Sequence, residues 1–246
     1  MKDFFNERKK NIKAQKKIIA QLEKSGVCFL SLDGVLISPH AKISPGVIIY
    51  PGTIIKGQAE IGAGCILGPN TLIQDSQIGE NCVINSSQIY SSVLEDNITV
   101  GPFAHIRPNC VIKNGVHIGN FVEAKNSSIG EGTKAGHLTY IGDSDVGERV
   151  NFGCGSITVN YDGVKKSRCD IGDEAFIGSN VNLIAPVKIG ENAFIAAGST
   201  LTRDVPNGAF AISRTREQTI KENWDKLRNK ANKMSAGNGE PDMAKE

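Results

Sequence analysis

Side chains that could bind or transform a ligand recur at matching places in a six-residue repeat near the middle of this chain. Counted in repeat units, Asn120, His137 and Cys154 hold the same place in successive turns, while Arg107 lies directly below Lys125 on another face. Histidine readily exchanges a proton near neutral pH, and cations suit anionic groups. The spacing therefore indicates a polar site, although a lone histidine in such a repeat is more often a corner residue.

A loop interrupts the repeat beside these residues. Thr158–Asp170 breaks the count, which Ile171 restores, so we expect about a dozen residues to bulge from the fold. Loops on a rigid repeat scaffold are where binding residues concentrate. This loop offers amide, phenol and ammonium groups that suit a polar or phosphorylated ligand. A solvated surface excursion is the alternative.

The repeat itself runs from Ile43 to about Pro206, with an aliphatic residue at every sixth place. This period is typical of an all-β fold, the parallel β-helix, in which each unit supplies one short strand and one corner. Three units make one triangular turn, so places three units apart stack at about 4.8 Å. One such stack is Glu123, Tyr140 and Ile157. Stacking is counted in units because some have only five residues: Ile73–Gln77, Ala124–Ser128 and Ile141–Asp145.

Three segments make up the chain. We expect residues 1–26 to form a linker-like helix with one apolar edge, and residues 27–206 to form the β-helix. Residues 207–246 are predicted to be a C-terminal arm with a short helix around Ile220–Lys230 and a disordered tail. The basic N-terminal helix could be a nucleic-acid arm, but a solvated linker or a helix at an oligomer edge is the simpler interpretation.

Composition narrows the classes of function. The 246 residues include 28 basic and 26 acidic side chains, so charge suggests neither a nucleic-acid nor a membrane partner. No hydrophobic run is long enough to span a membrane, and the apolar stretch of a signal peptide is missing. The six cysteines form no CxxC pair, and four occupy places inside repeat units. We therefore expect reduced thiols and a cytoplasmic protein.

The motifs around these residues resemble a known family. They are Gly101-Pro-Phe-Ala-His-Ile-Arg-Pro108, Gly119-Asn-Phe-Val-Glu-Ala-Lys125, Lys134-Ala-Gly-His-Leu-Thr-Tyr140, Val159-Asn-Tyr-Asp-Gly163 and Ala211-Ile-Ser-Arg214. In this order, over about residues 25–225, they resemble the acetyltransferase half of the bacterial bifunctional N-acetylglucosamine-1-phosphate uridyltransferase/glucosamine-1-phosphate N-acetyltransferase. The family's uridyltransferase domain would not fit before Ile43, so no uridyltransferase activity is expected. The N-terminal segment resembles the helix that links the two halves.

The resemblance implies a left-handed β-helix that works as an acetyltransferase. The expected reaction moves an acetyl group from acetyl-CoA to the 2-amino group of glucosamine 1-phosphate. The product, N-acetylglucosamine 1-phosphate, would serve the synthesis of UDP-N-acetylglucosamine and thereby of peptidoglycan. The family assembles as a homotrimer with its sites between subunits, and acetyl transfer is expected to need no metal.

The resemblance also assigns roles to single residues. His137 matches the catalytic base, which the reaction needs because a sugar amine is largely protonated at neutral pH, and Glu123 would orient or charge-stabilise the imidazole. Substrate-binding positions are matched by Arg107, Lys125, Tyr140, Asn151, Asn160, Tyr161 and Lys166. Positions lining the acetyl-CoA site, where backbone N–H groups can support the thioester oxygen, are matched by Cys154, Ser179, Ala197 and Arg214.

Two positions depart from the family pattern. Cys154 stands where alanine or another small residue is familiar. A role through the backbone would survive this change, while a catalytic thiol is the alternative. Beyond Arg214, the basic residue expected about six places on is Ile220, so Arg216 or Lys221 is the candidate to hold the CoA phosphates.

Three other functions compete with this one. Carbonic anhydrases on the same scaffold hold zinc with three histidines, but His105, His117 and His137 lie 12 and 20 residues apart, with no close pair. A non-catalytic scaffold would have lost its site, whereas His137, Lys125 and Arg107 are present together. An acetyltransferase for a different amino-sugar phosphate or nucleotide sugar keeps the same fold and chemistry.

Overall fold

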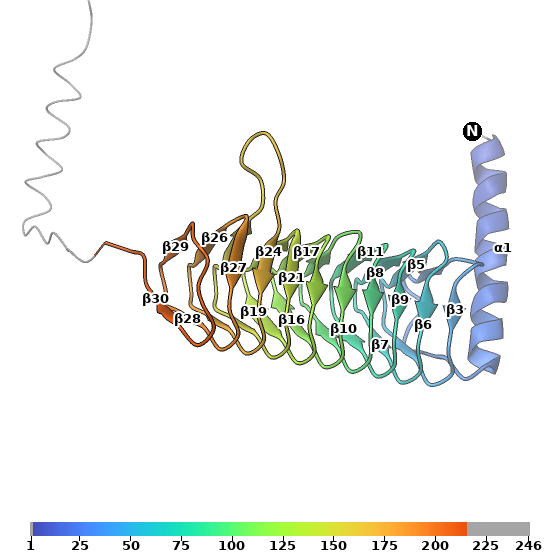
Figure 1. The fold of residues 1–246 in the computed structure, drawn as a ribbon. Helices are drawn as coiled ribbons and strands as arrows, with labels where there is room; N and C mark the ends of the chain where they lie inside the picture. The colour runs from blue at the N-terminus through green and yellow to red at the C-terminus, as the bar shows by residue number, and fades with distance from the viewer. Residues whose placement is uncertain (1, 216–246) are drawn as a thin grey trace, which may run out of the picture. The chain divides into compact units, whose positions relative to one another are not determined.

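The chain folds as a left-handed parallel β-helix with one helix, α1 (Lys2–Lys24), at its N-terminal end (Figure 1). The computed structural model describes residues 2–215 of the 246, with side chains from residue 10 onward. The C-terminal helix around Ile220–Lys230 and the disordered tail predicted from the sequence lie outside these residues.

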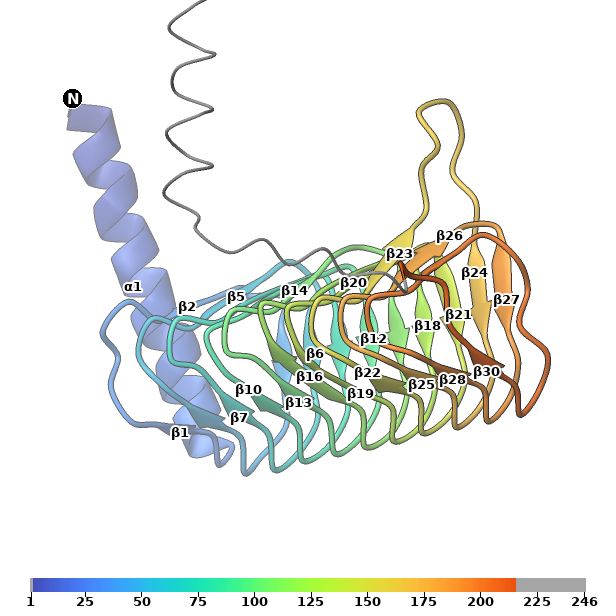
Figure 2. The same cartoon turned by 90° about the vertical axis from the view of Figure 1, so that its left-hand side faces the viewer.

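Thirty short strands between residues 28 and 211 form three parallel sheets, which are the faces of a prism (Figure 2). In order of pairing, sheet A contains β1 (Cys28–Phe29), β4 (Ile48–Ile49), β7 (Ile66–Leu67), β10 (Val83–Ile84), β13 (Thr99–Val100), β16 (His117–Asn120), β19 (Lys134–His137), β22 (Asn151–Phe152), β25 (Phe176–Ile177), β28 (Phe194–Ile195) and β30 (Phe210–Ala211). Sheet B contains β2 (Leu36–Ile37), β5 (Ile54–Lys56), β8 (Leu72–Gln74), β11 (Gln88–Tyr90), β14 (His105–Ile106), β17 (Glu123–Lys125), β20 (Tyr140–Gly142), β23 (Ile157–Val159), β26 (Asn182–Ile184) and β29 (Thr200–Leu201). Sheet C contains β3 (Lys42–Ile43), β6 (Glu60–Ile61), β9 (Gln77–Ile78), β12 (Val93–Leu94), β15 (Val111–Ile112), β18 (Ser128–Ile129), β21 (Ser144–Val146), β24 (Cys169–Ile171) and β27 (Val187–Ile189).

The interior is a column of aliphatic side chains that explains the period of the sequence. On sheet A, Ile49, Leu67 and Ile84 pair in register and are fully buried. Full burial of such a side chain contributes about 1.5–3 kcal/mol. Two places before Leu67 and Ile84 stand the buried thiols of Cys65 and Cys82, because three closely spaced sheets favour small or β-branched side chains there.

Buried serines two places before an inward aliphatic residue donate hydrogen bonds to nearby backbone carbonyls. Ser87 Oγ donates to the carbonyl of Asn85 at 2.7 Å, and Ser127 Oγ donates to the carbonyl of Lys125 at 2.8 Å. Among the side chains of residues 10–215, no buried nitrogen or oxygen lacks a hydrogen-bond partner. Serine and threonine therefore replace valine inside the prism without leaving a desolvated group unpaired.

Helix α1 packs against the first strand of sheet B. The Gln15 amide donates to the carbonyl of Ile37 at 2.8 Å and accepts from the Ile37 N–H at 2.9 Å. One side chain thus takes the place of a neighbouring strand, which protects an otherwise open sheet edge. The helix ends at Lys24, and Gly26, with a φ of +97°, then turns the chain so that the Val27 N–H reaches the carbonyl of Leu22.

The structure confirms the predicted stacking. Asn120 pairs with His137, and Ile106 pairs with Ala124, which places Arg107 beneath Lys125. The loop after β23 also forms as expected, and residues 160–168 project from the prism (Figure 1). Two further five-residue units exist, because Ile84, Ile89 and Leu94 occupy successive inward places.

The β-helix extends beyond the boundary at residue 206 that the sequence suggests. Strand β30 pairs with β28, so that Ala211 lies opposite Ile195. The repeat pattern in the sequence does not reveal this final unit, because its inward residue is alanine instead of a larger aliphatic residue. The edge strand of sheet A is therefore formed by residues 210–211.

We expect Gln15→Ala to destabilise the protein by about 1–3 kcal/mol, since it leaves both polar groups of Ile37 unpaired at a partly buried edge. The measurement is the free energy of unfolding from a denaturant titration. Gln21→Ala, at an exposed position of the same helix, is the control for helix propensity. Equal effects of the two substitutions would contradict the edge-protecting role.

Candidate active site

His137 lies at the corner between sheets A and B, and later turns place other candidate residues above it in a line. His137 follows Ala135 by two places, as Cys154 follows Phe152. Ser179 and Ala197 hold the same place in the next two turns, because the aliphatic residues before them pair in register. Neighbouring turns are about 4.8 Å apart. The corner therefore presents a straight row of equivalent positions.

The His137 imidazole is exposed and held by one hydrogen bond. Its Nδ1 lies 2.6 Å from Oδ1 of Asn120, one turn below. An amide oxygen only accepts, so Nδ1 donates in this contact, and Nε2 has no hydrogen-bond partner among the side chains of residues 10–215. The hydrogen bond thus fixes the ring so that Nε2 faces outward, toward a ligand at the corner.

Within one chain, Glu123 contacts an arginine and not the imidazole of His137. Glu123 accepts a hydrogen bond from Arg107 Nη1 at 2.8 Å, and this contact raises the pKa of the Arg107 guanidinium. Glu123 begins β17, on the face of sheet B, whereas Asn120 ends β16 beside the corner. The residue in register with His137 is therefore the one that holds it.

The row above His137 offers backbone amides that nothing else uses. The corner after sheet C differs, because aspartates of the next turn accept hydrogen bonds from the backbone N–H groups there. Glu80 N–H donates to Asp96 Oδ1 at 2.7 Å, and Glu148 N–H donates to Asp173 Oδ1 at 2.8 Å. Within residues 10–215, the amides of Cys154, Ser179 and Ala197 have no such acceptor. These N–H groups are available to a ligand.

Arg214 ends this row. Its Nη1 donates to the carbonyl of Ala197 at 2.7 Å, while the guanidinium remains exposed. The carbonyls of Cys154 and Ser179 accept instead from the amides of Asn180 and Gly198, at 2.8 Å each. The row thus carries free amides along its length and a cation at its far end, which suits an extended anionic molecule.

A cluster of cations lies on the neighbouring part of sheet B. Lys125 stacks above Arg107, and the loop brings Lys166 beside it. The nearby ammonium of Lys166 is the largest cause that lowers the pKa of Lys125; burial adds to it, and the Asp143 carboxylate opposes it. Cations held this close together favour an anion between them.

Tyr140 and Asn160 border the cation cluster. The Asn160 amide donates to the Tyr140 hydroxyl at 3.4 Å and also to the carboxylate of Asp143. Gly142 makes room for the phenol, because a Cβ there would lie 2.4 Å from the Tyr140 hydroxyl. Tyr161 lies further out on the loop, where its hydroxyl donates to the carbonyl of Gly163 at 2.6 Å.

Asn151, another expected substrate-binding residue, lies on a different sheet from this cluster. It begins β22 on sheet A, in register between Lys134 and Phe176. The imidazole of His137 lies at the other end of the neighbouring strand, about 10 Å further along the sheet.

Four side chains that the sequence analysis assigned no role also belong to the site: Asn120, Asn126, Asp143 and Arg168. Asn120 could have been found, because the register already placed it below His137. Asp143 gave no signal, since a Gly-Asp-Ser triplet is ordinary for a β-helix corner. Its importance comes from Asn126 and Asn160, which are distant in the sequence.

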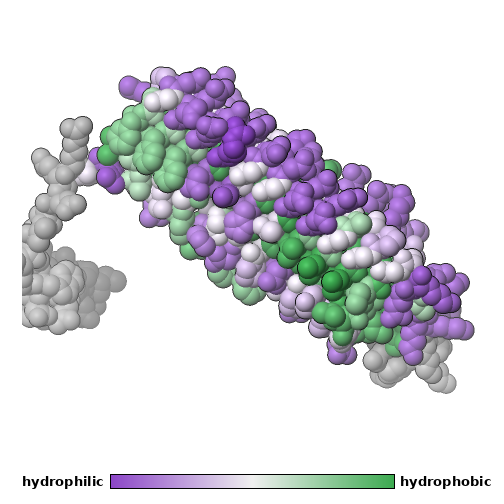
Figure 3. All heavy atoms as spheres, turned by 90° about the horizontal axis from the view of Figure 1, so that it is seen from below, coloured by the Kyte–Doolittle hydropathy of each residue, from purple (hydrophilic) through white to green (hydrophobic). Residues whose placement is uncertain are grey.

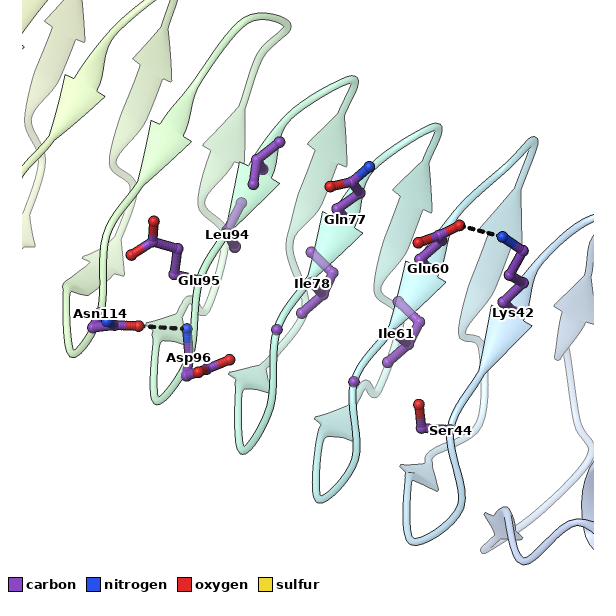
Figure 4. Close-up of a pocket in the computed structure, with 13 residues that line it drawn as sticks. Lys42, Ser44, Glu60, Ile61, Gln77, Ile78, Leu94, Glu95, Asp96 and Asn114 are labelled. Atoms are coloured by element: carbon purple, nitrogen blue, oxygen red, sulfur yellow. Dashed lines mark hydrogen bonds and ion pairs between the residues drawn. The ribbon is translucent and has the colours of Figure 1, made fainter.

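A separate hollow on sheet C shows no comparable chemistry (Figure 4). Its side chains include Lys42, Glu60 and Glu95. Lys42 pairs with Glu60 at 2.6 Å, and Glu95 pairs with Lys113 at 2.7 Å, so these charges are already compensated. Throughout residues 10–215, no three side chains of the metal-binding types gather around one point. Helix α1, the one helix among residues 2–215, is too rich in lysine to cross a membrane.

Comparison with known proteins places the chain among hexapeptide-repeat transferases. Residues 40–75, 91–124 and 168–203 match the family model for the bacterial transferase hexapeptide (six repeats). The bifunctional protein GlmU of Caldicellulosiruptor saccharolyticus is 58% identical over 199 residues, which cover 81% of this chain and 43% of that protein. GlmU of Thermoanaerobacter pseudethanolicus is 51% identical over 220 residues, or 89% of this chain and 48% of that protein. The chain thus spans slightly less than half the length of these relatives.

A solved structure supports the fold independently. The UDP-N-acetylglucosamine acyltransferase of Arabidopsis superposes with a TM-score of 0.63 at 21% identity, covering 82% of this chain and 77% of that one. At this identity the likeness concerns the fold alone. The sequence matches confirm the resemblance that the motifs indicated: the chain belongs to the GlmU family and corresponds to its hexapeptide-repeat half.

Proposed function

We propose that this protein transfers the acetyl group of acetyl-CoA to the 2-amino group of glucosamine 1-phosphate. The observation that carries the proposal is the arrangement of His137, held by Asn120 with Nε2 free, between a cation cluster and a row of unused amides. The product would be N-acetylglucosamine 1-phosphate, a precursor for UDP-N-acetylglucosamine. All six cysteines are free thiols, which fits the proposed cytoplasmic location.

In this mechanism, Nε2 of His137 removes a proton from the sugar ammonium or from the amine as it attacks. The amine then forms a bond to the thioester carbon, and the carbonyl oxygen gains negative charge. Free N–H groups along the row from Cys154 to Ala197 would stabilise that charge. The thiolate of CoA leaves with the bonding electrons, and Arg214 would hold the anionic end of the cofactor.

The cation cluster would hold the sugar phosphate. Arg107 is already paired with Glu123, and Lys125 lies 3.9 Å from a carboxylate oxygen of Asp143. Lys166 is exposed on the loop and adds the third cation. A phosphate between these groups would relieve the repulsion between the two ammonium groups.

We further propose that the active unit is a homotrimer with sites between subunits. The outward side chains of sheet A are apolar at both ends and polar in the middle, in the order Ile48, Ile66, Val83, Thr99, His117, Lys134, Asn151, Phe176, Phe194 and Phe210. Apolar areas near both ends of the prism are visible from below (Figure 3). The rings of Phe176 and Phe194 stack at 4.7 Å, and those of Phe194 and Phe210 at 5.8 Å. Such exposed apolar ladders favour packing against another copy.

A shared site would explain the position of Asn151. Within one chain this residue faces away from the cation cluster, on the polar middle of sheet A. If sheet A of one copy lies against the His137 corner of another, Asn151 can contact the same sugar. The trimer thus completes a substrate site that one prism holds only in part.

The test of the function is the release of CoA thiol from acetyl-CoA with four acceptors: glucosamine 1-phosphate, glucosamine 6-phosphate, free glucosamine and a UDP-linked amino sugar. Preference for glucosamine 1-phosphate supports the proposal. Preference for another acceptor would mean that the protein is an acetyltransferase with a different amino-sugar substrate. No release with any acceptor would favour the non-catalytic scaffold.

We expect His137→Ala to lower kcat by about 10²–10⁴-fold, because the amine loses its general base. The thiol-release assay measures the rate, and circular dichroism should show an unchanged fold because the imidazole is exposed. His40→Ala, at an exposed position of the first turns, is the control. Near-normal turnover of the His137 variant would exclude the base role.

For Lys125→Ala we expect a rise of about tenfold or more in the KM for glucosamine 1-phosphate, since one charged hydrogen bond contributes about 1.5–3 kcal/mol. The rate with free glucosamine should change little, because this acceptor carries no phosphate. Lys113→Ala, which removes a surface lysine of sheet C, serves as the control. An unchanged KM for glucosamine 1-phosphate would show that Lys125 does not bind the phosphate.

Cys154→Ala should leave kcat within about twofold, because the proposed mechanism uses the residue's backbone amide and not its thiol. Among the described residues, the Cys154 thiol makes no hydrogen bond with His137. Steady-state kinetics of the variant decide the matter. Loss of activity by a factor of about 10² or more would restore the catalytic thiol as an explanation.

A further inference from the structure

We propose that Asp143 is a positioning residue, which ties the loop of residues 160–168 to the cation cluster and so determines where the sugar phosphate binds. This inference rests on the proposed function. Asp143 would act through Lys125, Asn160 and Lys166, without touching the substrate itself.

The burial of Asp143 is the first observation. Its side chain is only 7% exposed, at a corner where its φ is +47°. Aspartate and asparagine adopt this left-handed conformation more readily than other residues with a side chain. A carboxylate removed from water in this way is stable only when its oxygens receive hydrogen bonds.

Two hydrogen bonds and one ion pair reach the carboxylate, from two separate segments of the chain. Asn126 Nδ2 donates to Oδ1 at 2.5 Å from the corner one turn below. Asn160 Nδ2 donates to Oδ2 from the root of the loop. Lys125 Nζ lies 3.9 Å from Oδ2. Asp143 is thus the point where the loop, the corner and the cation cluster meet.

The carboxylate is charged at neutral pH. Burial alone would raise the pKa of Asp143, but the amides of Asn126 and Asn160, together with the nearby charges of Lys125 and Lys166, lower it below its ordinary value. The local charges are therefore three cations, from Arg107, Lys125 and Lys166, and two anions, from Glu123 and Asp143. One positive charge remains for the phosphate.

A second attachment fastens the other end of the loop to the same turn. Arg168 donates to both oxygens of Asp145, at 2.8 and 2.6 Å, and to the carbonyl of Asn126 at 3.1 Å. The Cys169 N–H donates to the carbonyl of Asp143 at 3.2 Å. Because this end remains attached without the Asp143 carboxylate, its loss should free mainly the arm that carries Asn160 and leave the rest of the fold intact.

The carboxylate also explains why Lys166 can stay beside Lys125. Two ammonium groups repel each other, and the proximity of Lys166 already lowers the pKa of Lys125. Asp143 attracts both, and its bond to Asn160 holds the loop that carries Lys166. Without the negative charge, repulsion would move Lys166 outward and open the phosphate site.

The test is Asp143→Asn, which keeps the shape and tolerates the left-handed backbone. We expect the KM for glucosamine 1-phosphate to rise about tenfold or more, with the KM for acetyl-CoA and the rate with free glucosamine within about twofold. Trypsin should also cleave after Lys165 or Lys166 several times faster than in the unmodified protein, since the arm that carries Asn160 is no longer tied down. Asp170→Asn is the matched control, because this carboxylate of sheet C pairs with Lys188 and not with the loop.

The outcomes separate this inference from the proposed function. If the unmodified protein does not acetylate glucosamine 1-phosphate, the function fails, and tryptic cleavage alone decides whether Asp143 ties the loop. Unchanged cleavage and an unchanged KM would overturn the inference, as would an equal rise in both KM values with loss of stability. Should Asp143→Asn not fold, Asn126→Gly removes one donor at a position with φ of +47° and should cause a smaller change in the same direction.

Discussion

The structure depends on the register between successive turns of the prism. Backbone hydrogen bonds between turns fix each residue directly above the one three repeat units earlier, as in the pair of Asn120 and His137. The narrow interior enforces this register, because a shift of one residue would turn the aliphatic column outward and polar groups inward. Once the register is set, the position of every side chain on the surface follows from its place in the repeat.

The candidate site combines a regular row of corner positions with one irregular loop, residues 160–168. Equivalent places in successive turns form the row from His137 to Ala197, so a long molecule could be bound by repeated backbone groups instead of by a special loop. The break after β23 adds what the repeat cannot supply: Asn160 and Lys166 reach sideways to Asp143 and Lys125. A regular row and one irregular loop together provide both an extended and a compact binding surface.

The charges of the site balance one another incompletely. Glu123 neutralises Arg107, and the buried carboxylate of Asp143 lies between the loop and Lys125. Fully paired cations would have little affinity left for a phosphate, whereas unpaired ones would repel each other and displace the loop. The arrangement of three cations around two carboxylates lies between these extremes, which is a reasonable basis for reversible binding of an anionic sugar.

The sequence by itself determined the β-helix, the stacks around His137 and Lys125, and the place of the loop. It could do so because the repeat converts sequence spacing into spatial neighbours by simple counting. It did not reveal the final unit at Phe210–Ala211, whose inward residue is too small to be noticed. Nor did it identify Asn120 in place of Glu123 as the partner of the imidazole. Only the tertiary structure decided these contacts and those of Asp143, because side-chain direction and hydrogen bonds across an irregular loop are not periodic.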